Sequence, residues 1–223
     1  MPYTYPYPRP AVTADCVVLR FNPDQLEVLL IRRGHPPFEG RWALPGGFLD
    51  MDETLLQAAR RELEEETGLR LTLLEPLAVF DAPDRDPRGR VITLAHLALV
   101  RLDEQVAQAG SDASEAAWFP LGDLPELAFD HDQVLAAAQA ALRERVVRRP
   151  FGRELLPAEF TASDLERLYT AVLGRPLAPA ALEALLDLGH VVPGDEEAGP
   201  PPRLRFDPER YDRLAADGIL LEL

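Results

Sequence analysis

The sequence predicts a mixed α/β fold that is followed by a smaller, mainly helical C-terminal region. Three features carry this prediction. Short apolar segments typical of strands occupy most of residues 11–119, a run of strong helix formers interrupts them at 54–67, and two helical patterns follow residue 160. The chain has 223 residues, 47% of them hydrophobic, which suffices for one large domain and one small domain.

The strands and helices are expected in a regular order along the chain. Residues 11–20 and 26–32 have the pattern of two strands, and the turn signal Asn-Pro-Asp at 22–24 joins them. The remaining elements of this region are expected as strands at 71–80, 91–102 and 116–119 and as a helix at 130–145.

The helix expected at 54–67 has end signals on both sides. Asp52 or Glu53 precedes the run of helix formers, and Gly68 follows it at the position where a helix ends in a left-handed residue. The segment from 47 to 69 therefore predicts a loop, a helix and a second loop.

One face of this helix is strongly acidic. Glu62, Glu65 and Glu66 stand at positions i, i+3 and i+4 and share an arc of roughly 100°. Carboxylates at this spacing repel one another unless a cation lies between them, and Mg²⁺ prefers hard oxygen ligands. A solvated acidic surface is the alternative, but the fixed offsets of the surrounding residues favour a metal site.

These glutamates belong to a longer pattern. Its fixed positions are occupied by Gly47, Glu53, Arg61, Glu62, Leu63, Glu65, Glu66, Gly68 and Leu69. They fill every fixed position of the Nudix box, and the chain therefore resembles a Nudix hydrolase. The resemblance implies an α/β/α sandwich with a mixed sheet over roughly residues 8–148, and an activity that depends on Mg²⁺, with Mn²⁺ as the alternative metal.

The resemblance also implies roles for individual residues. The implied metal ligands are the Gly46 carbonyl and the carboxylates of Glu62, Glu65 and Glu66. Arg61 would orient these glutamates through a bidentate pair instead of touching the substrate. Glu53, in the loop before the helix, would support that arrangement.

Nudix enzymes take their general base either from the box or from a later loop. Glu65 is the candidate within the box. In the acidic loop that precedes the strand containing Trp118, Glu115 is the first candidate and Asp112 is the second. Simple solvation of both loop carboxylates is the alternative.

Arginines on loops are candidates for binding a phosphorylated substrate. Arg85, Arg88 and Arg90 lie on a polar turn between two expected strands, and Arg41 lies shortly before the box. The net charge of −15 opposes an anionic ligand, so local arginines and metal would have to bind it. Through the resemblance alone, the RDPRGRV stretch favours ADP-ribose, with AMP and ribose 5-phosphate as products.

The C-terminal region has the element order of a winged helix. Two helical segments on either side of 174–176 are followed by a short strand, a loop rich in Pro, Gly and acidic residues, and a second strand at 203–206. Together with YPRP at 7–10 and WALPGGF at 42–48, this order resembles Nudix-related transcriptional regulators of NAD metabolism. Those regulators join an ADP-ribose-binding Nudix domain to a DNA-binding winged helix. The expected domains are a Nudix domain at 1–148 and a winged-helix-like domain at 149–223.

The charge of this second domain argues against DNA binding. The segment expected to enter a DNA groove, 178–188, contains no Arg or Lys and carries Glu183 and Asp187. Residues 151–223 hold 7 basic and 14 acidic side chains, a net charge of −7. Because nonspecific DNA affinity comes mainly from cationic side chains, we expect no DNA partner. An ADP-ribose-sensing, DNA-binding regulator is kept as the alternative to an ADP-ribose pyrophosphatase.

Composition also bears on location and assembly. Cys16 is the single cysteine, so an intrachain disulfide is excluded. The first ten residues lack the charged and apolar regions of a signal peptide, and no apolar run reaches membrane-spanning length. A cytoplasmic protein without a membrane partner is expected, and the resemblance together with apolar helical faces near the C-terminus implies a homodimer.

Overall fold

The computed structural model describes residues 6–102, 113–194 and 200–221. These residues form two compact units, each assembled from several stretches of the chain. Unit 1 lies within residues 1–18, 28–98 and 106–138, and unit 2 lies within residues 19–27, 99–105 and 139–223. The predicted division into domains at residue 148 stays a prediction.

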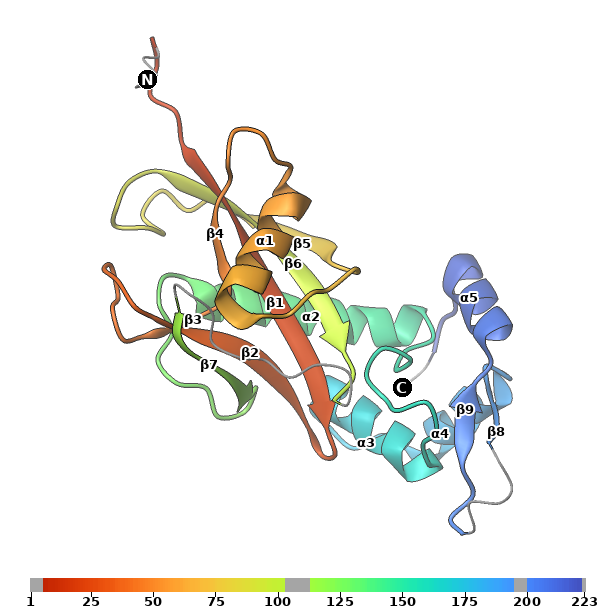
Figure 1. Ribbon diagram of the computed structural model, residues 1–223. Helices are drawn as coiled ribbons and strands as arrows, with labels where there is room; N and C mark the ends of the chain where they lie inside the picture. The colour runs from red at the N-terminus through yellow and green to blue at the C-terminus, as the bar shows by residue number, and fades with distance from the viewer. Residues whose placement is uncertain (1–5, 103–112, 195–199, 222–223) are drawn as a thin grey trace. The chain divides into compact units, whose positions relative to one another are not determined.

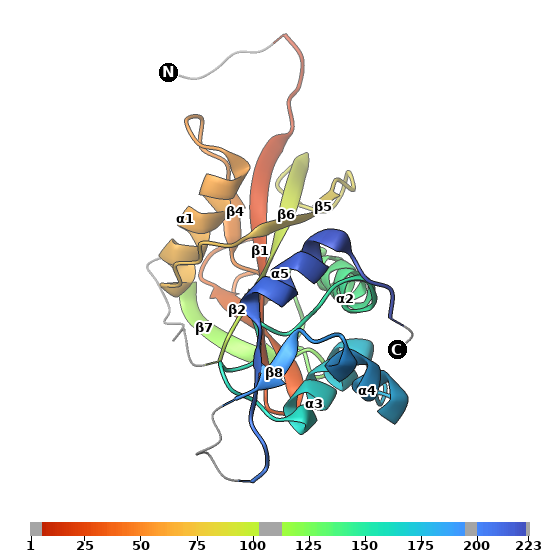
Figure 2. The same cartoon turned by 90° about the vertical axis from the view of Figure 1, so that its right-hand side faces the viewer.

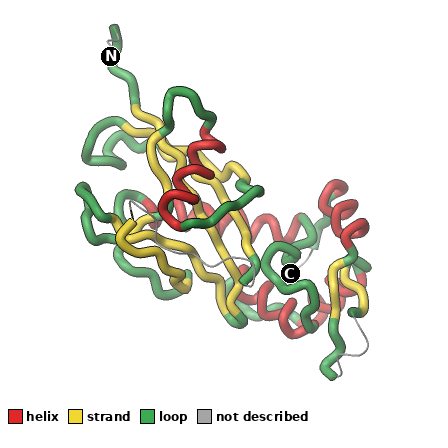
Figure 3. Tube along the Cα trace, in the orientation of Figure 1, coloured by secondary structure: helices red, strands yellow, loops and turns green. Residues whose placement is uncertain are grey.

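A seven-stranded sheet is the main feature of the fold (Figure 3, yellow). The order along the sheet is β3-β2-β1-β6-β5, while β4 pairs with β1 and β7 pairs with β2. β1 and β2 are buried along most of their length, as expected for strands that are covered on both faces. The strands are β1 (Ala11–Asn22), β2 (Gln25–Arg33), β3 (Trp42–Ala43), β4 (Gly46–Phe48), β5 (Glu75–Phe80), β6 (Val91–Val100) and β7 (Ala113–Pro120).

Helices cover both faces of this sheet. α1 (Leu55–Thr67) and the beginning of α2 (His131–Arg148) lie on opposite sides of it (Figures 1 and 2). Ala59 and Leu63 of α1 are fully buried, and the Cys16 thiol of β1 donates a hydrogen bond to the Ala59 carbonyl at 3.3 Å. The predicted sandwich of a mixed sheet between helices is therefore confirmed.

The N-cap of α1 is Thr54, because the Thr54 hydroxyl and the Gln57 side chain form a reciprocal capping box. One local expectation is wrong, since the strand expected from residue 71 begins at Glu75. Gly68 does end α1 in the left-handed conformation, with φ of 71°, as the sequence predicts.

Unit 2 contains the predicted order of two helices followed by two strands. A further helix, α5 (Pro208–Asp217), follows the second of these strands and was not predicted. β8 and β9 pair antiparallel, with Val191 opposite Phe206. The predicted elements are α3 (Ala162–Leu173), α4 (Pro179–Asp187), β8 (Val191–Pro193) and β9 (Leu204–Phe206). The fully buried core of the unit includes Phe151, Phe160, Leu165, Leu168, Tyr169 and Leu185.

Among the described residues, the structure contains no helix that is both long and apolar enough to cross a membrane.

Candidate active site

Two adjacent glycines bring the acidic face of α1 against the sheet. In the pairing of β1 with β4, Asp15 lies opposite Gly46 and Ala14 lies opposite Gly47. A Cβ atom on Gly47 would clash with the carboxylate of Glu62, and one on Gly46 would lie 2.6 Å from Oδ1 of Asp15. Any side chain at either position would displace a carboxylate, so the close approach requires glycine.

Arg61 is the centre of the hydrogen-bond network on α1. Its Nη2 donates to Oε1 of Glu53 at 2.7 Å and its Nε donates to Oε2 of Glu53 at 3.1 Å, which makes a bidentate pair. Nη1 donates to Glu62 at 2.8 Å and to Glu65 at 3.2 Å. Nη2 also donates to the Phe48 carbonyl at 3.1 Å. One guanidinium therefore fixes the loop before α1 and two glutamates of the helix.

The pKa values of this network follow from its pairing. Hydrogen bonds from Arg61 lower the pKa of Glu53, and the bond to Glu53 is the main reason that the pKa of Arg61 is raised. Both groups are therefore held in their charged forms. This arrangement supports the orienting role predicted for Arg61 and the supporting role predicted for Glu53.

Glu66 has the opposite electrostatic environment. Its Oε2 accepts a hydrogen bond from the Gly46 amide at 2.9 Å. Burial raises the pKa of Glu66 to about 8, and the nearby charges of Glu62 and Asp15 add to this shift. Burial also raises the pKa of Glu62. Negative charge on this face is thus unfavourable as it stands and would be favoured by a nearby cation.

The carboxylate oxygens of this face suit a hard divalent cation. Their present positions, however, do not form a complete set of metal ligands. In the described part of the chain, no three His, Cys, Asp or Glu side chains converge closely enough to hold a metal ion. Arg61 engages one oxygen each of Glu62 and Glu65 and thereby draws these carboxylates toward itself. Both carboxylates are thereby held on the same face of α1.

The two described candidates for the general base lie at different places. Glu65 is half exposed on α1, with its carboxylate at Arg61. Glu115 is half exposed on β7, which contacts α1, and lies 3.8 Å from Arg32. Asp112 lies outside the described residues. Both Glu65 and Glu115 stay candidates.

The predicted substrate-binding arginines differ in their accessibility. Arg41 pairs with Glu126 at 2.8 Å, and Arg90 donates to the carbonyl of Asp81 at 2.7 Å. Arg88 pairs with Asp86, and its guanidinium carbon lies 4.8 Å from the centre of the Phe48 ring. These three side chains lie at or near the surface and can be reached by a ligand.

Arg85 is buried, unlike the other three. Only 8% of the residue is exposed, and its guanidinium donates two hydrogen bonds to Asp130, at 3.0 and 2.7 Å. A buried bidentate pair of this kind fixes the start of α2 to the loop after β5. Arg85 therefore contacts any ligand only from the wall of an internal pocket.

That internal pocket lies beside the two glycines. It has a volume of about 80 Å³, and its lining is mostly polar or charged. Its charged and ionisable lining includes Asp15, Arg85, Arg88 and His131. One wall is formed by β4, through Gly46, Gly47 and Phe48. Asp15 and His131 were missed by the sequence analysis. For Asp15, the available signal was an ionisable residue in the middle of a mostly apolar strand.

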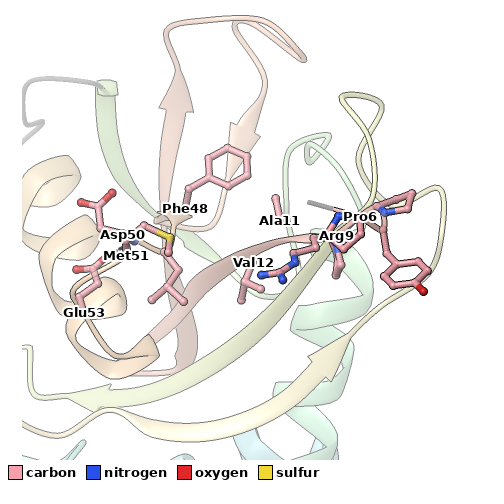
Figure 4. A pocket seen from close by; sticks show the side chains of 12 residues that line it. Pro6, Arg9, Ala11, Val12, Phe48, Asp50, Met51 and Glu53 are labelled. Carbon is pink, nitrogen blue, oxygen red and sulfur yellow. Dashed lines mark hydrogen bonds between the residues drawn. The ribbon is translucent and has the colours of Figure 1, made fainter. Parts of the chain in front are cut away.

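A larger groove lies on the other side of Phe48. It has a volume of about 820 Å³ and runs between residues 6–12 and residues 48–53 (Figure 4). Phe48 lines both the groove and the internal pocket. Glu53, which binds Arg61, also lines the groove, so both hollows border the Nudix-box network.

Comparison with known proteins identifies the family. The NUDIX domain model matches residues 9–144, which is more than half of the chain. The chain therefore belongs to the Nudix family, and the predicted resemblance to Nudix hydrolases is confirmed.

Two relatives and one solved structure resemble the chain over long stretches. The ADP-ribose pyrophosphatase of Methanocaldococcus jannaschii is 44% identical over 129 residues, which are 58% of this chain and 73% of that protein. The ADPR responsive transcriptional repressor NtrR of Acinetobacter baylyi is 33% identical over 215 residues, which are 92% of this chain and 86% of the repressor. The crystal structure of Shewanella oneidensis NrtR complexed with a 27mer DNA has a TM-score of 0.76 at 28% identity, covering 95% of this chain and 99% of that one.

Proposed function

We propose that the chain hydrolyses the diphosphate linkage of a nucleoside diphosphate derivative, and that ADP-ribose is the substrate and AMP and ribose 5-phosphate are the products. The observation that carries this proposal is the partly buried Glu66 carboxylate, which lies beside Glu62 and accepts a hydrogen bond from the Gly46 amide. A carboxylate with a pKa raised to about 8 has a strong electrostatic preference for a neighbouring cation.

The residues of the proposed site have separate roles in the reaction. Glu62, Glu65, Glu66 and the Gly46 carbonyl would hold Mg²⁺, or Mn²⁺ in its place. When bound, the metal would neutralise diphosphate charge and lower the pKa of water. Arg61 and Glu53 keep the glutamates in place, and Glu65 or Glu115 would take the proton from the attacking water.

Substrate binding is assigned to the arginines around the two hollows. Arg88 lies at the internal pocket with its guanidinium over the Phe48 ring, and Arg41 and Arg90 are accessible to phosphate or ribose oxygens. Arg85 acts from the pocket wall. The 44% identity to an ADP-ribose pyrophosphatase supports ADP-ribose over other nucleotides.

The test is metal-dependent turnover of ADP-ribose beside NADH, diadenosine polyphosphates, nucleotide sugars and nucleoside triphosphates, with products resolved chromatographically. Preferred conversion of ADP-ribose to AMP and ribose 5-phosphate is the expected result, with Mg²⁺ and Mn²⁺ assayed in parallel. Preferred turnover of a different nucleotide would show that ADP-ribose is not the substrate. Absence of turnover with all of these compounds would refute the proposed enzymatic function.

One observation favours a second function, an ADP-ribose-responsive repressor. The NtrR repressor matches 92% of the chain, including the C-terminal unit. Against it stand the acidic helix α4 and the net charge of −7 over residues 151–223. We therefore keep the prediction that this unit does not bind DNA, and we assign it to packing or dimerisation.

Assembly and location complete the proposal. We propose a homodimer in the cytoplasm, without a membrane partner. Sedimentation at micromolar concentration should give the mass of two chains, and a single monomeric species would refute the dimer.

A further inference from the structure

Asp15 occupies an unusual position within the internal pocket of unit 1. Only 6% of the residue is exposed, and its Oδ2 has no hydrogen-bond partner among the described residues. A buried carboxylate oxygen without a donor is costly, because the lost hydration is not replaced. Thr13, on the same face of β1, also has a buried hydroxyl oxygen that lacks a hydrogen-bond partner among the described residues.

Two donors face Asp15 at distances that are too long for direct hydrogen bonds. Oδ2 of Asp15 lies 3.6 Å from Nη2 of Arg85 and 3.9 Å from Nε2 of His131. Hydrogen bonds from nitrogen to oxygen normally span about 2.7–3.2 Å. The three groups therefore surround a point where one additional polar atom would complete the network.

The protonation of His131 is determined by its other contact. Nδ1 accepts a hydrogen bond from the Leu44 amide at 2.9 Å, so Nδ1 carries no proton. Burial lowers the pKa of His131, which keeps the ring neutral and leaves its proton on Nε2. Nε2 is thus a donor that faces the acceptor Oδ2 across the pocket.

A hydroxyl group matches this pair, because one hydroxyl both accepts and donates a hydrogen bond. It would accept from Nε2 of His131 and donate to Oδ2 of Asp15. The exocyclic amine of a nucleobase can only donate effectively, so it would satisfy Asp15 and leave the donor on His131 unpaired.

We propose that Asp15 and His131 form a subsite for a ribose hydroxyl of the substrate and determine specificity for it. The inference rests on the proposed function, since the pocket shares Gly46 and Gly47 with the Nudix-box site. Asp15 and Glu62 lie against neighbouring glycines, so a sugar held at Asp15 would be separated from the acidic helix only by these two residues.

The test compares ADP-ribose with analogues that lack one hydroxyl, either on the adenosine ribose or on the terminal ribose, and with the inosine counterpart, which lacks the base amine. In the wild type, removing the hydroxyl that binds the subsite should lower kcat/KM about 30-fold or more, because the buried pair is then left unsatisfied. The position of that hydroxyl identifies which ribose is bound.

Asp15→Asn and His131→Asn are the test variants. Asparagine at 131 keeps an acceptor for the Leu44 amide and removes the Nε2 donor without a change of charge. Each variant should lower kcat/KM for ADP-ribose about 10-fold and shrink the penalty for the missing hydroxyl to less than about 3-fold. Glu27→Gln is the matched control, since Glu27 is also 6% exposed but pairs with Arg20 away from the pocket.

The outcomes separate this subsite from the proposed function. An unchanged hydroxyl penalty in both variants, or loss of the amine penalty instead, would overturn the subsite. Calorimetric binding of the same ligands with metal removed is measured alongside turnover. If the wild type turns over no ligand, the proposed function fails; the subsite then stands if Asp15→Asn abolishes the hydroxyl preference in binding and falls if it does not.

Discussion

The two units of the molecule treat buried polar groups in different ways. Among the described residues, the buried polar and charged side chains all lie in unit 1 except Glu27 and His190. Unit 1 pairs or clusters these groups around the Nudix-box helix and the pocket at Asp15. Unit 2 buries an aromatic and aliphatic core, and the acidic residues of its helix α4, Glu183 and Asp187, are exposed to solvent.

This difference locates the chemistry. Burying ionisable groups costs free energy, so a unit that does so repeatedly around one spot retains them for a purpose other than stability. Unit 2 has a core typical of a packing module. The difference between the units can be tested by four substitutions or assays, in order of decreasing expected effect.

Glu66→Gln should have the largest effect. An amide keeps the size of the side chain but loses the charge that would hold a metal, so kcat should fall about 1,000-fold or more while the protein stays folded. Turnover of ADP-ribose and the circular dichroism spectrum measure the two quantities. Glu64→Gln, on the same helix and at the ion pair with Arg70, is the control. Full activity of Glu66→Gln would mean that the acidic face is not the site.

Arg61→Lys should have the next largest effect. An ammonium group keeps the charge, but it cannot bind both oxygens of Glu53 while also binding Glu62. We expect kcat/KM to fall about 100-fold. Arg60→Lys is the control, because Arg60 is on the same helix and donates to the Thr72 carbonyl instead. Equal activity of the two variants would contradict the orienting role of Arg61.

His190 tests the interior of unit 2 through pH. Burial and, to a smaller extent, the charge of Arg210 lower its pKa to about 4. An unfolded histidine titrates near 6.5, so below that pH the unfolded state binds more protons and stability falls as pH drops from about 6.5 toward 4. We expect amide exchange of α3 to show a loss of about 1–2 kcal/mol between pH 7 and pH 5.

His190→Phe should remove most of this pH dependence, since phenylalanine fits beside Phe206 and carries no titratable group. His35→Phe, which changes an exposed histidine in unit 1, should leave it in place. Persistence of the full pH effect in His190→Phe would show that another group of unit 2 is responsible.

DNA binding should give the smallest signal. The wild type is expected to produce no saturable gel shift with duplex DNA at low salt, because α4 is acidic. Replacing Glu183 and Asp187 together by lysine should introduce weak, salt-sensitive binding. A tight, saturable complex of the wild type would reverse the assignment of unit 2 and favour the repressor function.

The sequence was sufficient where signals are local. The Nudix-box spacing placed Glu62, Glu66 and Arg61 on one helix, and Gly68 marked its end. Hydrophobic periodicity located most of the strands. These features depend on residues that are close in the chain, so their geometry follows from helix and strand repeats.

The sequence was insufficient where distant segments meet. Arg85 belongs to a polar turn, and nothing near it in the sequence indicates the pair with Asp130, which lies 45 positions further along the chain. Asp15 lies in an apolar strand, and its role depends on where His131 of α2 packs.

The glycine pair at 46 and 47 has a consequence for the diversification of substrates. The two glycines separate Asp15, which lies against Gly46, from Glu62, which lies against Gly47. Residues that select the ligand can therefore be exchanged on β1 and α2 while the hydrolytic helix is left untouched. A mutational library confined to Thr13, Asp15 and His131 is thus a route to new specificities at constant bond-breaking chemistry, whereas a side chain at Gly46 or Gly47 would displace a carboxylate.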